Sequence, residues 1–134
     1  MQNSTDKEGT KKAISLFLLL HGIGILKTSF DMGNIKVRPN ILFGINVDTY
    51  YILGFIIGLI LIIDAVGLLL KGKFFYIITM IISLSAIVYI IISIIYIILI
   101  NGLSADFPAF FILVIFLIIY GAIFINIKSR FRMR

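Results

Sequence analysis

Cysteine and tryptophan are absent from the 134-residue sequence, and histidine occurs once. Without cysteine there is no thiolate zinc site, iron–sulfur cluster or thiol redox centre, and a single histidine cannot supply the paired axial ligands of a membrane b-type haem. The sequence also lacks an H-E-x-x-H motif and a glycine-rich phosphate loop. These absences predict a protein that is not an enzyme and has no cofactor or metal site.

Charged residues are also scarce, at 13% of the chain, whereas 61% is hydrophobic. A helix needs about 20 mostly apolar residues to cross a bilayer core, and we assign spans to residues 13–30, 50–70, 74–100 and 108–127. Isoleucine favours strands in water, but runs such as IVYIIISIIYIILI lack the period-2 alternation of a membrane barrel. The predicted fold class is therefore all-α, an integral membrane four-helix bundle.

The first span is the weakest of the four, because the apolar run between Lys12 and Lys27 contains His21, Gly22 and Gly24. The alternative is a secretory signal sequence, since lysines precede an apolar stretch. No A-x-A-like cleavage site follows, and the histidine interrupts the run. We therefore predict a spanning helix in which the Lys27 ammonium reaches back to the interface.

The positive charges are distributed unequally between the two ends of the predicted spans. Only Lys27, Lys36 and Arg38 fall on one side, and nine fall on the other: Lys7, Lys11, Lys12, Lys71, Lys73, Lys128, Arg130, Arg132 and Arg134. The positive-inside rule then predicts that both termini are cytoplasmic. Since these cations gather at helix ends beside a membrane, the +6 net charge indicates anionic lipid headgroups and not nucleic acid as their partner.

Three regions lie outside the spans or between them. Residues 1–12 form a polar tail expected to be disordered, 13–127 form the membrane domain, and 128–134 form a basic tail. In loop 31–49, apolar and polar residues alternate on both sides of Pro39, which predicts a small extended or hairpin element. Gly72 between two lysines predicts a tight turn that packs the second span against the third.

Small residues recur on two of the spans, where they permit close helix packing in lipid. Gly54 and Gly58 form a G-x-x-x-G with Ala65 near the same face. In the third span the small residues share one helical stripe, and they are Thr79, Ser83, Ala86 and Ser93. The functional alternative is that these residues line a pathway for a small polar solute; we favour packing.

His21 and Asp64 are the ionisable residues placed well inside the predicted membrane. Counting from the flanking lysines puts them about 13 and 10 Å from the same boundary, so they could form a proton-coupled pair. The structural alternative is an interhelical hydrogen bond, which we favour. The segments LLLHGIGIL (18–26) and LIIDAVGLL (61–69) align each polar residue three before a glycine, which would suit an inverted repeat.

The segment VGLLLKGK at 66–73, followed by a long isoleucine-rich span, resembles small prokaryotic four-span membrane proteins of unknown function. The resemblance covers hydropathy and one short turn, carries no catalytic or binding position, and implies a multi-pass protein of a prokaryotic cell membrane. The isoleucine and lysine bias is typical of an AT-rich, archaeal-type genome. Size and span number also resemble small multidrug transporters, but their first-span glutamate is missing here.

We therefore expect a non-enzymatic membrane protein that acts through helix packing, as a homo-oligomer or as an accessory subunit of another membrane protein. The alternative is a small proton-coupled transporter or channel that uses Asp64 and His21. A third class is a lytic or pore-forming protein, for which the basic tail KSRFRMR is the one indication.

Overall fold

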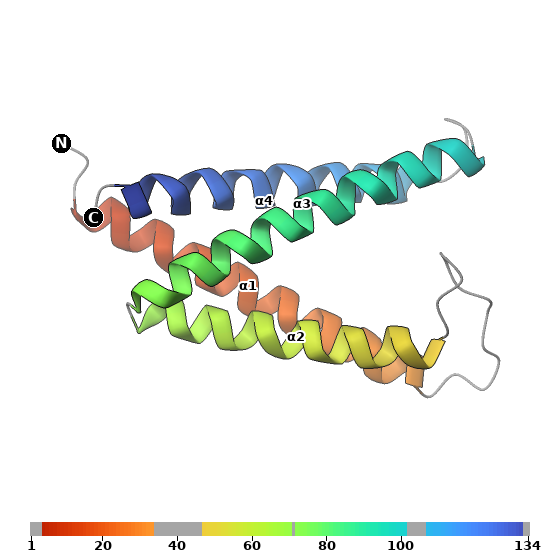
Figure 1. The fold of residues 1–134 in the computed structure, drawn as a ribbon, viewed down its shortest axis with the longest axis horizontal. Coiled ribbons are helices and arrows are strands. Elements are labelled where there is room, and N and C mark those ends of the chain that lie inside the picture. Colours follow the sequence, from red (N-terminus) through yellow and green to blue (C-terminus); the bar gives the residue numbers. More distant parts are fainter. Residues whose placement is uncertain (1–3, 34–46, 71, 102–106, 133–134) are drawn as a thin grey trace. The chain divides into compact units, whose positions relative to one another are not determined.

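The computed structural model describes residues 4–33, 47–70, 72–101 and 107–132. These residues form four helices (Figure 1): α1 (Ser4–Gly33), α2 (Val47–Leu69), α3 (Lys73–Asn101) and α4 (Phe107–Arg132). Each helix contains a segment long and apolar enough to cross a membrane: Lys7–Asp31, Tyr51–Leu69, Lys73–Leu99 and Phe110–Arg130. The predicted all-α class and the four long apolar helices are confirmed.

The helices are organised as two units that divide after Gly72. In each unit two helices lie side by side and antiparallel, α1 with α2 and α3 with α4 (Figure 1). The predicted packing of α2 on α3 falls where the two units divide, so it stays a prediction.

Two segments predicted to be irregular are helical in part, and the prediction of a disordered tail is wrong for residues 4–12. The polar tail 1–12 enters α1 at Ser4, and an i,i+4 ion pair between Lys12 and Glu8, 3.7 Å apart, supports its first turns. In the predicted extended loop 31–49, α1 continues to Gly33 and α2 begins at Val47. The rest of that loop lies outside the described residues.

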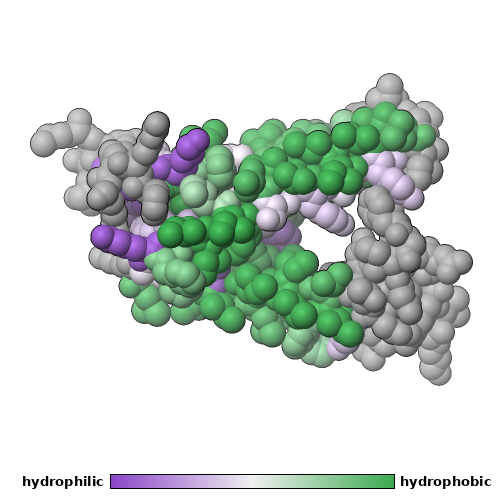
Figure 2. Space-filling model, in the orientation of Figure 1, coloured by the Kyte–Doolittle hydropathy of each residue, from purple (hydrophilic) through white to green (hydrophobic). Residues whose placement is uncertain are grey.

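Isoleucine, leucine and phenylalanine cover most of the outer faces of the described helices (Figure 2). Backbone hydrogen bonds are satisfied inside each helix, so these β-branched sequences can be helical in a solvent that offers no hydrogen bonds. The apolar segments differ in length. At 1.5 Å per residue, the 19-residue apolar segment of α2 extends about 28 Å and the 27-residue apolar segment of α3 about 40 Å.

The α1–α2 contact is closest where two glycines meet. A Cβ atom placed on Gly22 would lie 2.9 Å from the carbonyl oxygen of Gly58, and one placed on Gly58 would lie 3.0 Å from the carbonyl oxygen of Gly22. These distances are at or below the limit that real Cβ atoms show, so glycine is what lets the two backbones approach. One turn away on α2, the space that a Cβ on Gly54 would need is occupied by the side-chain hydroxyl of Ser29. The G-x-x-x-G groove predicted on α2 is therefore filled by α1.

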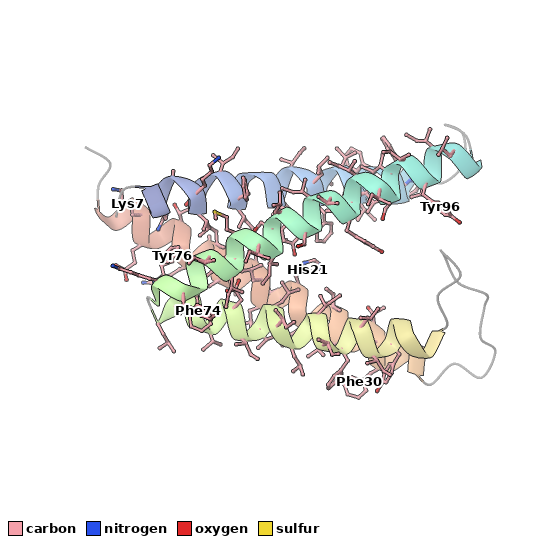
Figure 3. The ribbon with its side chains drawn as sticks, viewed as in Figure 1. Lys7, His21, Phe30, Phe74, Tyr76 and Tyr96 are labelled. Atoms are coloured by element: carbon pink, nitrogen blue, oxygen red, sulfur yellow. The ribbon has the colours of Figure 1, made fainter. Side chains whose placement is uncertain are left out.

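The matching face of α1 is built from a seven-residue repeat that our sequence analysis does not recognise. Ser15, Gly22 and Ser29 recur every seven residues and are all buried. A seven-residue spacing keeps side chains on one helix face, as in the left-handed packing of membrane bundles. At the other end of the contact from Ser15, Phe30 meets Phe55 edge-on with ring centroids 5.7 Å apart (Figure 3 labels Phe30). The contact thus follows α1 over much of its length.

We predict that Gly22→Ala destabilises the protein by about 1–3 kcal/mol, because the added methyl group would overlap the Gly58 carbonyl and force the helices apart. Gly24→Ala is the matched control, since a Cβ there has no atom within 4 Å. In a helix it should leave stability unchanged or raise it by up to about 1 kcal/mol. Unfolding by SDS in mixed micelles, followed by far-UV circular dichroism, measures both. Equal losses for the two variants would contradict the assigned contact.

Candidate functional site

Asp64 lies inside the apolar segment of α2 and is fully buried. It stands six residues after Gly58 in α2, directly before the buried Ala65. An aspartate at the centre of a membrane helix costs roughly 2.5–3.5 kcal/mol on insertion scales, so such residues are rare in spans and often functional. A carboxyl group in this position is therefore the strongest candidate in the described chain for a functional group.

His21 is half-buried and lies next to Gly22 at the α1–α2 crossing (Figure 3). Its ring packs on Phe17 one turn earlier, with centroids 5.7 Å apart and planes tilted by 48°. Figure 3 places His21 in the middle part of α1, between Lys7 and Phe30 near its two ends. The histidine is thus held beside the helix contact by an aromatic neighbour on its own helix.

The glycine contact sets the relative depth of these two groups. Gly22 lies opposite Gly58, and the helices are antiparallel, so Asp64 is displaced about 9 Å and His21 about 1.5 Å from that level in the same direction. The axial offset between them is then about 7.5 Å, compared with about 3 Å from counting residues to the flanking lysines. A direct pairing of His21 with Asp64 stays a prediction.

Ser15 is the buried polar side chain of α1 that lies nearest the depth of Asp64. Seven residues before Gly22, it is displaced about 10 Å from the crossing, which brings it level with Ala65 and within about 2 Å of the level of Asp64. Only 2% of Ser15 is exposed, and its Oγ has no hydrogen-bond partner among the residues that the structure describes. A buried hydroxyl thus lies at the height of the buried carboxyl. Serine is not ionisable, so a search of the sequence for ionisable groups does not find it.

The hydroxyl groups of the α3 stripe are hydrogen-bonded within their own helix. Thr79 donates to the Phe75 carbonyl at 2.7 Å, Ser83 to the Thr79 carbonyl at 2.7 Å, and Ser93 to the Tyr89 carbonyl at 2.9 Å. Thr79 and Ser83 are fully buried, while Ala86 and Ser93 are half-buried on the same stripe. Because each hydroxyl proton is already donated to the backbone, the stripe suits helix packing better than the solvation of a passing solute.

The predicted topology anchors differ in their surroundings. Lys12 is exposed and paired with Glu8, whereas Lys11 is only 6% exposed. A lysine in a disordered tail, as the sequence predicts here, would be exposed. Lys73 is exposed at the start of α3. The C-terminal end of α4 carries Lys128, Arg130 and Arg132, and the remaining two anchors, Lys71 and Arg134, lie outside the described residues.

The inverted-repeat alignment of residues 18–26 with 61–69 pairs residues that differ in burial. It matches Gly24 of α1 with Gly67 of α2, but Gly24 is exposed and Gly67 is buried. It also matches the half-buried His21 with the fully buried Asp64. Equivalent positions in a structural repeat should share burial, so the alignment gains no support from these residues.

Metal binding and relationships to other proteins add no further site. Within the described part of the chain, no group of three or more histidine, cysteine or acidic side chains is placed to hold a metal ion. No protein-family model, curated protein or solved structure matches the chain. The resemblance to small prokaryotic four-span proteins therefore stays a prediction, and the residues themselves carry the functional argument.

We predict that Ser15→Ala raises stability by about 1 kcal/mol, because it removes a buried hydroxyl that has no hydrogen bond to lose. Ser83→Ala is the matched control. That substitution removes an equally buried hydroxyl that donates to the Thr79 carbonyl, so it should be neutral or destabilising. The SDS unfolding midpoint distinguishes the two, and a loss of stability in Ser15→Ala would show that its hydroxyl has a partner.

Proposed function

We propose that the protein is a multi-pass integral membrane protein that acts through helix association, without catalysing a reaction. The observation that supports this most directly is the backbone approach of Gly22 and Gly58, which builds a closely packed α1–α2 hairpin from small residues. Large apolar side chains remain exposed along the helices, including Leu84, Val88 and Ile95 of α3. Such faces suit lipid or a neighbouring transmembrane helix.

The proposed partners follow from these faces. A homo-oligomer would place the exposed apolar faces of neighbouring copies together, and an accessory role would place them against another membrane protein. The proposed location is the cell membrane of a prokaryote, consistent with the composition of the chain. In either assembly, the α1–α2 hairpin would be the rigid part of the subunit.

In the proposed topology both termini are cytoplasmic. Nine lysine and arginine residues are then on the cytoplasmic side and three on the other, which is the bias that the positive-inside rule requires. The cations of α4 stand at its C-terminal end, and Lys73 begins α3, so both helices of this hairpin carry their positive charge at the same end.

The natural absence of cysteine makes this topology directly testable. We expect a membrane-impermeant maleimide applied to intact cells to label Asn34→Cys and Gly102→Cys, and to label Asn3→Cys and Met133→Cys only after the cells are opened. Labelling of position 3 or 133 in intact cells would contradict cytoplasmic termini. If positions 3 and 34 were labelled from the same side, α1 would not span.

A proton-coupled transporter is the second proposed function, and the complete burial of Asp64 in an apolar helix supports it. We expect no proton flux if the helix-packing proposal is right. If the transporter proposal is right, pH-gradient dissipation in proteoliposomes should be lost in Asp64→Asn and reduced in His21→Ala. Asp31→Asn, at the exposed end of α1, is the control and should not alter flux. Flux that survives Asp64→Asn would contradict the transporter proposal.

A further inference from the structure

Two of the cations near the end of α4, Arg130 and Lys128, are held by neutral groups. The Arg130 Nε donates to the Asn126 Oδ1 at 2.8 Å, and the Lys128 Nζ lies over the Phe124 ring, 5.8 Å from its centroid. Ser129 donates from its Oγ to the Asn126 carbonyl at 2.8 Å, which further ties this turn together. Neither an amide nor an aromatic ring cancels a positive charge, so both side chains are oriented and keep their full charge.

The charge balance around this turn is one-sided. The α4 sequence, 107–132, contains no aspartate or glutamate, and the one acidic residue between 73 and 134 is Asp106, before the opposite end of the helix. At the start of α1, by contrast, Lys12 has Glu8 3.7 Å away. The end of α4 therefore carries an excess of positive charge that no acidic residue of the same helix balances.

The position of the turn along the helix corresponds to the level of lipid phosphates. The apolar segment of α4 runs from Phe110 to Arg130, which is 21 residues or about 30 Å. A typical hydrocarbon core is also about 30 Å thick. If Phe110 lies at one boundary of the core, Arg130 lies at the other, where headgroup phosphates are found.

The two held cations flank an exposed apolar stripe. Ile118, Ala122 and Ile125 occupy one face of α4, with Ile118 66% and Ile125 69% exposed, and Ser129 continues that face at the helix end. At 100° per residue, Asn126 lies to one side of Ile125 and Phe124 to the other. Arg130 bonded to Asn126 and Lys128 over Phe124 therefore stand on opposite flanks of the stripe where it reaches the interface.

We propose that this end of α4 binds an anionic phospholipid, with its phosphate between Arg130 and Lys128 and an acyl chain along Ile125, Ala122 and Ile118. The bond from Nε to Asn126 leaves the terminal guanidinium nitrogens of Arg130 for two phosphate oxygens, a geometry that arginine forms and lysine cannot. Free phosphate shares the headgroup chemistry, but it would leave the apolar stripe unused. The proposed ligand is therefore a lipid and not free phosphate.

The proposal rests on the proposed membrane insertion, yet it is tested separately from topology. Native mass spectrometry of the full chain in neutral detergent counts bound lipids, and the probes are phosphatidylglycerol and phosphatidylcholine. We expect one phosphatidylglycerol to bind in preference to phosphatidylcholine, and Arg130→Gln to weaken that binding about tenfold or more, the loss typical of a charge-assisted hydrogen bond. Lys12→Gln removes the same charge from a paired lysine and should have little effect.

Two variants that keep the net charge separate a formed site from diffuse attraction. Asn126→Ala frees the guanidinium and Arg130→Lys removes its fork, so each should weaken phosphatidylglycerol binding several-fold. Unchanged binding in both, or an equal loss in Lys12→Gln and Arg130→Gln, would overturn the proposal. Displacement of the lipid by excess inorganic phosphate would overturn the role of the apolar stripe. Circular dichroism of each variant verifies that the helices are intact.

Discussion

The backbone contact between Gly22 and Gly58 is the interaction on which the organisation of the α1–α2 hairpin depends. In lipid, an isoleucine gains little by leaving acyl chains for another helix, so association requires atoms that approach closely over a long face. Glycine provides this approach because it has no Cβ. With that contact in place, the register brings Ser15 to the level of Asp64 and Phe30 against Phe55.

The polar groups of the spans fall into two chemical kinds. The hydroxyls of Thr79, Ser83 and Ser93 donate to carbonyls of their own helix and so place little demand on their surroundings. Ser15 is different, because its buried Oγ has no hydrogen-bond partner among the described residues. Asp64 differs in carrying a fully buried carboxyl group, which is costly to place in hydrocarbon. The α1–α2 hairpin consequently carries the buried polar groups with the greatest potential for chemistry.

Much of the fold could be predicted from the sequence, because the hydrophobic length of a span is dictated by the bilayer itself. The four helices, their approximate limits and the importance of Gly54 and Gly58 all follow from residue type and spacing. The identity of the helix facing Gly58 did not follow. Several spans offer small residues that could pack against Gly58. Which helix does so depends on how two helix surfaces fit along their length, and the sequence of one helix does not reveal that fit.

Local features were missed for a similar reason. Gly22 reads as an interruption of a weak span when hydropathy alone is considered, although its seven-residue relation to Ser15 and Ser29 marks a packing face. The polar start of α1 reads as a disordered tail because composition ignores the i,i+4 pairing of Glu8 with Lys12. The held cations of α4 depend on which side chain each contacts, and charge counting treats them all as equivalent topology anchors.

The length of α3 has a consequence for the kind of membrane that suits the protein. Its apolar segment of about 40 Å exceeds the hydrocarbon thickness of a typical bilayer, about 30 Å, by roughly a third. Hydrophobic mismatch of this size is relieved when the helix tilts by about 40° from the membrane normal or when lipids stretch around it. The slope of α3 should therefore follow bilayer thickness, and a thicker membrane would hold the helix more upright.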